Sequence, residues 1–423
     1  MGSKDTYRGD SAGKKITRAR LWLSAANWMR NIGAPYCGSL VLTGHGGDIS
    51  TLKGWGFKPE SISAVDRVHS LTIAAENKHP DCFLATGDVD QIAQHRKYNA
   101  VHLDFCNGLT VENILTVTEV VRSAPVVPMW LGVTFLKGRE QKESKSPLVP
   151  DLSRTERKAL KRLFISEDNE VAASLMSHGV FDLCLLRKQA EKRLRRCMPP
   201  AVDRDAPSCR IYDKHSRLSP LGKALVRVDI LRQAVMSQLH DEGISLRPLV
   251  VYSYHSGVGK RGSGTPFITV GFVVYPSSLR KHIEDTVMDC GALMRFEQLP
   301  TDLGIRGLKH CALDLLEGQN AKQVAQILDI THGTVNAWKA HDTMGTYRSE
   351  LAEMAKNAVG FHYMNPTGGL TPCELGWGMV RTGGSGVDMD KAIDAMEARR
   401  KARMNGAGRH ESAAMMSSFR RQS

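Results

Sequence analysis

Two glycines and three aspartates stand where short apolar runs of this sequence end. The glycines are Gly44 and Gly46, in the segment GSLVLTGHGGDIS. The aspartates Asp66, Asp88 and Asp104 each follow or close a later apolar run. A glycine-rich turn lets a ligand approach the backbone closely, and a carboxylate at the end of the next strand can accept hydrogen bonds from ribose hydroxyls. The pattern predicts a nucleotide-type ligand.

A parallel sheet would bring these residues together. From Ala25 onward, short apolar runs alternate with helix-like segments, as in a sheet that is covered by helices on both faces. The expected strands lie within residues 38–50, 61–68, 81–93, 98–110 and 126–140, and residues 110–121 have helical spacing. Open parallel sheets bind ligands at the carboxyl ends of their strands, where the glycines and aspartates fall. The expected fold class is α/β, with a doubly wound, Rossmann-like sheet.

Residues 247–276, RPLVVYSYHSGVGKRGSGTPFITVGFVVYP, read as two further strands joined by a glycine-rich loop. Together with the strand-end residues, this hairpin resembles the class I S-adenosylmethionine-dependent methyltransferase family, whose sheet ends in an antiparallel hairpin of this kind. The resemblance covers about residues 21–276, with a large insertion. It implies S-adenosylmethionine as the cofactor.

The resemblance also implies a role for each strand-end residue. Gly44 and Gly46 would line the methionine and ribose part of the cofactor. Asp66 would bind the ribose hydroxyls, Asp88 would lie near the adenine, and Asp104 would face the transferred methyl group.

The sequence departs from the family pattern in two places. Family members usually carry an acidic residue just before the glycines, and this chain has Leu42 and Thr43 there. The segment LDFCNG lacks the Asp/Asn-Pro-Pro-aromatic signature of amino-methylating DNA enzymes. Cys106 lies near the position of the nucleophile of cytosine-5 DNA enzymes, but Phe105 replaces their proline. Cys106 is therefore either a catalytic nucleophile or a buried, unreactive thiol.

The charge of the chain favours a polyanionic partner. There are 57 Lys+Arg against 44 Asp+Glu, which gives a net charge of +13. Basic segments with helical spacing lie at residues 154–164 and 185–197, inside the insertion that we place at 141–247. They either bind nucleic acid or form a solvated face.

Other classes of protein are disfavoured. The nine cysteines form no CxxC pair, which favours a reducing cytoplasm, and no metal site is expected. No apolar run approaches the roughly 18 residues that a membrane span needs.

Residues 321–341, AKQVAQILDITHGTVNAWKAH, have the apolar spacing of two short crossing helices. The expected core residues are Val324, Leu328, Ile330, Val335 and Trp338. Ala325 is the small residue needed where the two backbones approach. Asp329 falls in the turn, where a positive φ is usual and is tolerated by Asp better than by most residues. Thr331 would cap the second helix, and residues 306–319 would form a supporting helix.

This stretch resembles the helix-turn-helix domains of transcription regulators and of phage and transposon proteins. The outer face of the second helix would then enter a DNA groove. That face offers Thr331, His332, Gly333, Asn336 and Lys339. Asn can bond adenine through two hydrogen bonds, and Lys can bond guanine or phosphate, so these are the expected DNA-binding residues.

The sequence thus predicts a basic flexible tail at 1–20 and a methyltransferase-like domain at 21–280. A helix-turn-helix domain at 300–350 and a largely flexible extension at 351–423 would follow. Two functions remain open. The chain is either a cytoplasmic DNA-binding enzyme that methylates nucleic acid, or a non-catalytic transcriptional regulator or phage or mobile-element protein whose α/β domain is a scaffold. A homo-oligomer or a protein partner is compatible with both.

Overall fold

A computed structural model of the chain describes the α/β domain, the helices that follow it and a few short segments. The described residues are 11–31, 36–123, 128–137, 187–188, 190–192, 217–218, 220–239, 242–256, 264–279, 295–298, 304–316, 318–341, 359–362 and 381–382. Residues 1–10, nearly all of the predicted insertion before residue 217 and most of the extension after 350 lie outside them. Within the described part, no helix is both long and apolar enough to cross a membrane.

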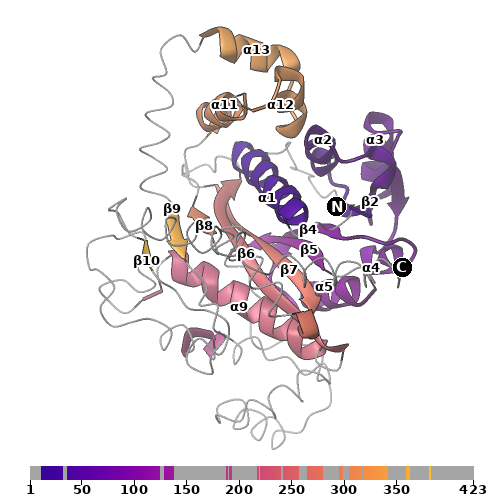
Figure 1. The fold of residues 1–423 in the computed structure, drawn as a ribbon, viewed down its shortest axis with the longest axis vertical. Helices are drawn as coiled ribbons and strands as arrows, with labels where there is room; N and C mark the ends of the chain where they lie inside the picture. Colours follow the sequence, from indigo (N-terminus) through magenta and orange to yellow (C-terminus); the bar gives the residue numbers. More distant parts are fainter. Residues whose placement is uncertain are drawn as a thin grey trace, which may run out of the picture.

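The strands form one mixed sheet (Figure 1). Their order is β10-β9-β8-β6-β7-β5-β4-β1-β2-β3. The first five are β1 (Ser39–Leu42), β2 (Ile62–Asp66), β3 (Phe83–Thr86), β4 (Ala100–Gly108) and β5 (Met129–Leu136). The others are β6 (Ile244–Ser256), β7 (Thr265–Pro276), β8 (Arg295–Gln298), β9 (Val359–His362) and β10 (Arg381–Thr382). The five strands that the sequence predicted are confirmed as β1 to β5.

Neighbouring strands among β1 to β5 pair in parallel, as predicted. β7 then pairs antiparallel with both β5 and β6. The antiparallel hairpin predicted within residues 247–276 is therefore confirmed, and β6 begins slightly earlier, at Ile244. The fold is therefore α/β, with a mixed sheet whose strands β1 to β5 pair in parallel with one another.

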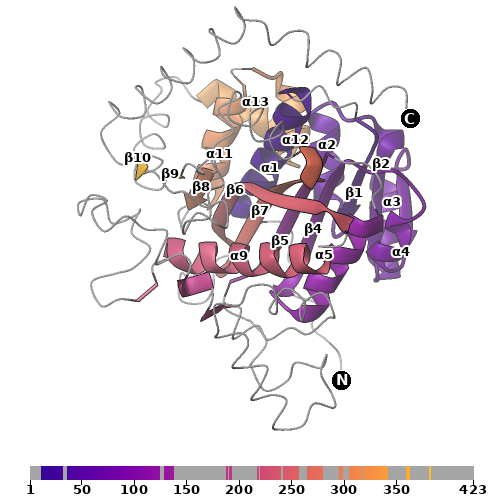
Figure 2. The same cartoon turned by 60° about the horizontal axis from the view of Figure 1, so that its bottom comes forward.

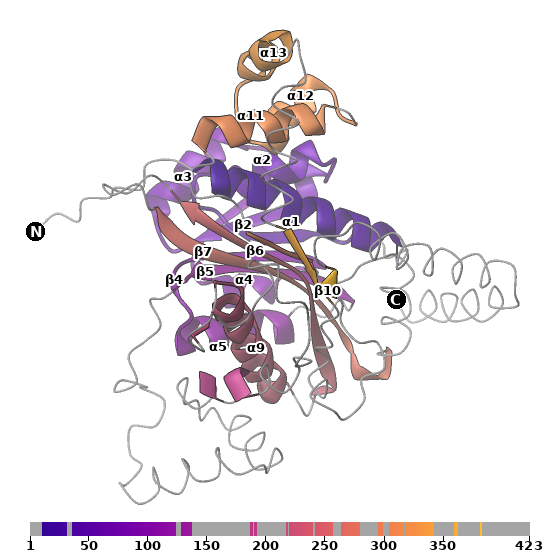
Figure 3. The ribbon, with the colours of Figure 1, turned by 90° about the vertical axis from the view of Figure 1, so that its left-hand side faces the viewer.

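Helices cover both faces of the sheet (Figure 3). One face carries α1 (Ala12–Asn31), α2 (Gly47–Gly54) and α3 (His69–Lys78). The other carries α4 (Val89–Ala93), α5 (Val111–Ser123) and α9 (Pro220–Gln238). Alternate strand residues pack into two separate hydrophobic cores, one on each face of the sheet. Val101 and Leu131 belong to the core beneath α5 and α9. Val41 and Trp130 belong to the core beneath α1 and α2. This alternation is the two-residue period of strands that are buried on both faces.

The prediction of a flexible tail at residues 1–20 is wrong for residues 12–20. Residues from Ala12 onward form α1, in which Ile16 and Ala19 are buried. The basic residues that suggested a solvated tail instead make ion pairs with the rest of the protein: Lys14 with Asp104 and Arg18 with Asp48. Helix formation buries the apolar residues, and the ion pairs satisfy the charges between them.

The predicted insertion 141–247 also extends too far, because its last part belongs to the α/β domain. Residues 220–238 form α9, which lies along the sheet beside α5 (Figure 2). Leu225, Val228 and Leu231 of this helix are fully buried in the core of the sheet. Their spacing of three residues places them on one side of the helix, so α9 is a covering helix of the α/β domain.

Three further helices form a layer over α1 and α2 (Figures 1 and 3). They are α11 (Gly304–Leu315), α12 (Ala321–Ile327) and α13 (His332–His341). The apolar residues predicted at 324, 328 and 335 are fully buried, and Ile330 and Trp338 pack against them half-buried. The same core includes Ile16 and Ala19 of α1, so this layer shares its interior with the α/β domain.

We call α12 and α13 the helix pair, and its first helix, α12, touches α2 directly. Thr51 Oγ1 of α2 donates a hydrogen bond of 2.8 Å to the Ile327 carbonyl. A Cβ placed on Gly54 would lie 2.6 Å from both Cγ1 and the backbone nitrogen of Ile327. Only a residue without a side chain allows this approach, so Gly54 is a requirement of the contact.

Candidate functional site

The strand order reverses at β1. From β1 the chain moves outward to β2 and β3, and it then returns to place β4 on the other side of β1. Such a reversal leaves a crevice at the carboxyl ends of the two central strands, because the connections leave them in opposite directions. The crevice therefore lies beyond Leu42 of β1 and the end of β4, where the sequence predicted a ligand.

A glycine-rich turn joins β1 to α2 at this crevice. Gly44 and Gly46 have φ angles of 45° and 75°, in the left-handed region that favours glycine. The Gly46 amide closes the turn by donating to the Thr43 carbonyl at 2.8 Å. Beside Gly44, the space where a Cβ would point holds no atom within 4 Å. The turn thus exposes backbone at the point where a ligand would approach it.

Asp66 lies one strand away and is bonded to the same turn. Its Oδ2 accepts a hydrogen bond of 3.2 Å from the Gly44 amide, and its Oδ1 accepts one of 2.8 Å from the Val68 amide. The half-buried carboxylate therefore faces the glycine-rich turn. Each carboxylate oxygen retains a further lone pair, so both can still accept a bond from a ligand hydroxyl.

Asp88 lies on the neighbouring strand connection, at the N-cap of α4. The chain reaches it through Gly87, whose amide donates to the Asp66 carbonyl at 3.0 Å. Arg67 forms ion pairs with both Asp88 and Glu112. The structure thus brings Asp66 and Asp88 to adjacent strand ends, and Asp88 is already paired with an arginine.

Asp104 lies on the other side of the crevice. Val41 of β1 is paired with His102 of β4, so Asp104 stands two residues further on, beside the start of the glycine-rich turn. Its Oδ2 lies 2.7 Å from Lys14 Nζ of α1, and the Asp104 side chain is only 9% exposed. The backbone of Cys106 belongs to β4, but its side chain lies outside the described part of the structure.

A buried polar network, which the sequence did not reveal, holds the start of α2. Asp48 Oδ1 accepts from Trp22 Nε1 at 2.7 Å and from His102 Nδ1 at 2.8 Å. Its Oδ2 accepts from Arg18 Nε at 3.1 Å, and both side chains are 4% exposed. Burial alone would raise the pKa of the Asp48 carboxyl, but His102 and Arg18 outweigh it and hold the pKa well below its ordinary value.

The network continues across the sheet. His102 Nε2 lies 2.9 Å from Thr134 Oγ1, which is 2.6 Å from Thr269 Oγ1. Asp48, His102 and Thr134 have the spacing of an acid, a base and a nucleophile. However, Thr134 is 1% exposed, so no substrate can reach its hydroxyl. The network therefore fixes α1, α2 and the central strands relative to one another.

His79, at the end of α3, supports the other side of the glycine-rich turn. Its Nε2 donates to the Gly46 carbonyl at 3.2 Å, and its Nδ1 lies 3.5 Å from Lys53 Nζ. Burial and the positive charges of Lys53 and Lys78 lower the pKa of His79 to about 4. A neutral ring can donate from one nitrogen and accept at the other, which matches both contacts.

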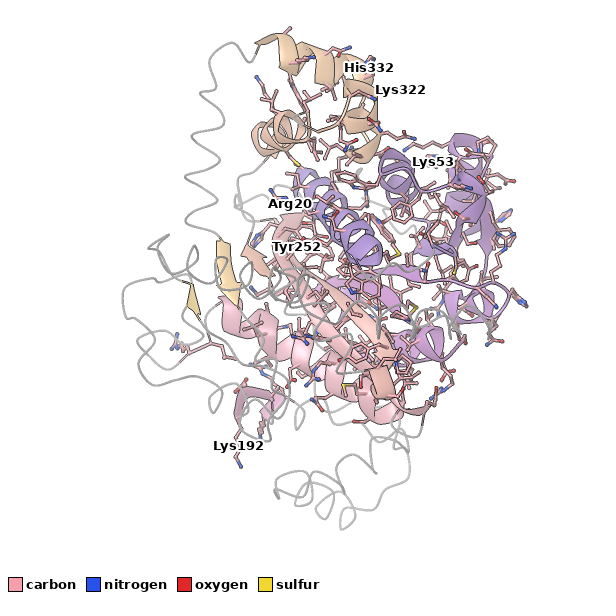
Figure 4. The ribbon with its side chains drawn as sticks, in the orientation of Figure 1. Arg20, Lys53, Lys192, Tyr252, Lys322 and His332 are labelled. Atoms are coloured by element: carbon pink, nitrogen blue, oxygen red, sulfur yellow. The ribbon has the colours of Figure 1, made fainter. Side chains whose placement is uncertain are left out.

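The predicted DNA-binding residues lie on the outer helix of the helix pair. Thr331, His332, Gly333, Asn336 and Lys339 are all exposed. Thr331 Oγ1 accepts from the Thr334 amide at 3.2 Å and so caps α13, as predicted. His332 and Lys322 project from the layer that lies farthest from the sheet (Figure 4). The structure thus places these residues together on one surface, separate from the glycine-rich turn.

Simple signals could have revealed part of the missed network. His102 interrupts the apolar run of β4, and it shares a strand face with Ala100 and Asp104 because alternate residues point the same way. Arg18 and Trp22 of the network are four residues apart on one helix face. Among the described residues, no group of three or more His, Cys, Asp or Glu side chains could hold a metal ion.

Neither a protein-family model nor a curated protein sequence matches this chain. Among solved structures, the chain has a partial likeness to Trm1 from Pyrococcus horikoshii in complex with S-adenosyl-L-methionine, at 10% identity and a TM-score of 0.33. That match covers 68% of this chain and 62% of Trm1, so less than two thirds of Trm1 is spanned.

Two other solved structures show a similar degree of likeness. Magnesium protoporphyrin IX methyltransferase from Synechocystis PCC 6803, with bound SAH, is 12% identical, with 62% and 85% of the two chains covered and a TM-score of 0.29. PKMT2 from Rickettsia typhi, in complex with AdoHcy, is 11% identical, with 65% and 56% covered and a TM-score of 0.28. These scores carry no activity over to this chain.

Replacing Asp48 with Asn should lower the free energy of unfolding by about 3–5 kcal/mol at neutral pH, because the buried charge of Arg18 would lose this carboxylate. The pKa of Asp48 is lowered by folding, so its contribution is complete above the unfolded value of 3.8 and is lost as the pH falls through the folded value. The gap between wild type and variant should therefore narrow below about pH 4. Urea unfolding of both proteins at several pH values measures this difference in the free energy of unfolding.

The half-exposed Asp90 of α4 provides the matched control. Asp90→Asn should change the unfolding free energy by less than about 0.5 kcal/mol. An Asp48→Asn variant as stable as this control at neutral pH would show that the buried network is not a stabilising element.

Proposed function

We propose that the α/β domain binds S-adenosylmethionine at the glycine-rich turn, that the helix pair binds DNA, and that the chain methylates nucleic acid. One observation carries the proposal. The Asp66 carboxylate faces the open turn at Gly44, at the point where the strand order reverses. This arrangement matches a ligand with a ribose, because a carboxylate accepts hydrogen bonds from vicinal hydroxyls while glycine backbone makes room for the rest.

Asp104 supports the choice of a group-transfer cofactor. It lies across the crevice from Asp66, on the far side of β1, and its carboxylate is largely buried. Bound S-adenosylmethionine would supply an electrophilic methyl group. Asp104 would hold an acceptor amine or hydroxyl by accepting its hydrogen bond, and the buried setting would strengthen that bond.

The surface of α13 supports DNA as the partner. Its first turn exposes His332 and Gly333, and Asn336 follows one turn later on the same side. The N-terminal part of such a helix meets base edges in the major groove, and an Asn there can bond adenine. The net charge of +13 would favour approach to the phosphate backbone.

A second candidate is a DNA-binding regulator without catalysis. The ion pair between Lys14 and Asp104 favours it, because Lys14 occupies the carboxylate that an acceptor would need. Leu42 and Thr43, where family members usually carry an acid, favour it as well. Transfer of labelled methyl groups from S-adenosylmethionine to duplex DNA separates the two candidates.

Asp66→Asn should weaken S-adenosylmethionine binding about tenfold or more. The neutral amide loses a charge-assisted hydrogen bond to the ribose, worth about 1.5–3 kcal/mol, and tenfold corresponds to about 1.4 kcal/mol. Isothermal titration calorimetry of wild type, Asp66→Asn and the control Asp90→Asn measures this change. Equal affinity in all three would remove Asp66 from the site, and no heat from wild type at millimolar ligand would refute the cofactor.

Asn336→Ala and Lys339→Ala should each reduce retention on random-sequence duplex DNA. Loss of Lys339 should also lower the slope of log affinity against log salt by about one, because one fewer phosphate contact releases one fewer counterion. Filter binding at several salt concentrations measures both quantities. Lys97→Ala, at an exposed lysine just before β4, is the control. If the affinity and the slope match those of this control, α13 is not the DNA-binding helix.

A further inference from the structure

The turn between α12 and α13 contains an aspartate where glycine would cost nothing. Asp329 has a φ of 51° and is, within the described residues, the one non-glycine residue with a positive φ. For an L-residue this conformation costs roughly 1–2 kcal/mol. Asp tolerates it better than most residues, and interactions of Asp329 with neighbouring elements stabilise it further.

Lys78 and Lys15 supply such interactions from the α/β domain. Lys78 Nζ, at the end of α3, lies 2.6 Å from Asp329 Oδ1. Lys15 Nζ of α1 donates to the Asp329 carbonyl at 2.5 Å. Burial would raise the pKa of Asp329, but the hydrogen bond and charge of Lys78, together with Ser50 and Lys15, outweigh it, and the pKa is lowered. Glycine could form the turn, but only a carboxylate can bind Lys78.

The same part of α3 holds the glycine-rich turn. His79, the residue after Lys78, donates to the Gly46 carbonyl. Two adjacent residues thus hold the turn of the helix pair and the turn of the proposed cofactor site. Helix α2 provides a second connection, since it starts at the glycine-rich turn and its Thr51 bonds the Ile327 carbonyl.

We propose that Asp329 is a positioning residue that locks the helix pair onto α2 and α3. DNA on α13 and S-adenosylmethionine at the glycine-rich turn then bind to connected elements, and each ligand tightens the binding of the other. This inference rests on the proposed function. The physical basis is that either ligand orders elements that the other also needs, and such coupling is reciprocal.

Calorimetric titration of S-adenosylmethionine, with and without saturating random-sequence duplex DNA, tests the coupling. In wild type the duplex should lower the dissociation constant about fivefold. In Asp329→Gly the coupling should fall to less than about twofold, because the contact with Lys78 is gone while glycine retains the turn. Each ligand alone should bind this variant as it binds wild type, and circular dichroism should show unchanged helix content.

Lys78→Met removes the same contact from the other side and leaves the helix pair unaltered. It should lose the coupling too, whereas Lys97→Met, at an exposed lysine of the α/β domain, should keep it. If Asp329→Gly fails to fold, the coupling measured in Lys78→Met tests the inference instead.

Three results would overturn the inference. The first is coupling that persists in Asp329→Gly and Lys78→Met. The second is a wild-type protein that binds both ligands without coupling, which leaves the proposed function standing. The third is a wild-type protein that binds neither ligand, which refutes the proposed function as well.

Discussion

The buried carboxylate of Asp48 is the constraint on which the edge of the sheet depends. A charge removed from water costs several kcal/mol unless other groups replace its hydration. Arg18 and Trp22 of α1 and His102 of β4 do so here, because each places one donor nitrogen within 3.1 Å of an Asp48 carboxylate oxygen. Helix α2 can therefore start where it does only when α1 is in place, and the glycine-rich turn before it is fixed by the same contacts.

Helix α1 then connects three sites with neighbouring residues. Lys14 pairs with Asp104 at the crevice, Lys15 bonds the turn of the helix pair, and Arg18 reaches Asp48. Helix α2 has contacts on both sides as well, with the Asp48 network towards the sheet and Ile327 on its outer side. The helix pair is consequently part of the same packed structure as the sheet, and the two proposed ligands would bind to connected elements.

The sequence predicted the elements whose signal is local. Strands β1 to β5 follow from short apolar runs that end at turn residues, and the turn at Asp329 follows from the spacing of Val324, Leu328 and Val335. Prediction from the sequence failed where the role of a residue depends on a partner far along the chain. Basic residues of α1 looked like a solvated tail because Asp104 and Asp48, which neutralise Lys14 and Arg18, lie far along the chain. Likewise α9 looked like part of a basic insertion, although its apolar side covers the sheet.

The central claim is that the turn from Thr43 to Gly47, together with Asp66, forms the binding site for S-adenosylmethionine. Amide hydrogen exchange of the wild-type chain, with and without the cofactor, tests it most directly because it locates the bound ligand on the backbone. Exchange should slow at Gly44, Gly46 and the residues around Asp66, and α13 should be affected far less. Unchanged exchange in this turn at saturating cofactor, or protection confined to another region, would contradict the account.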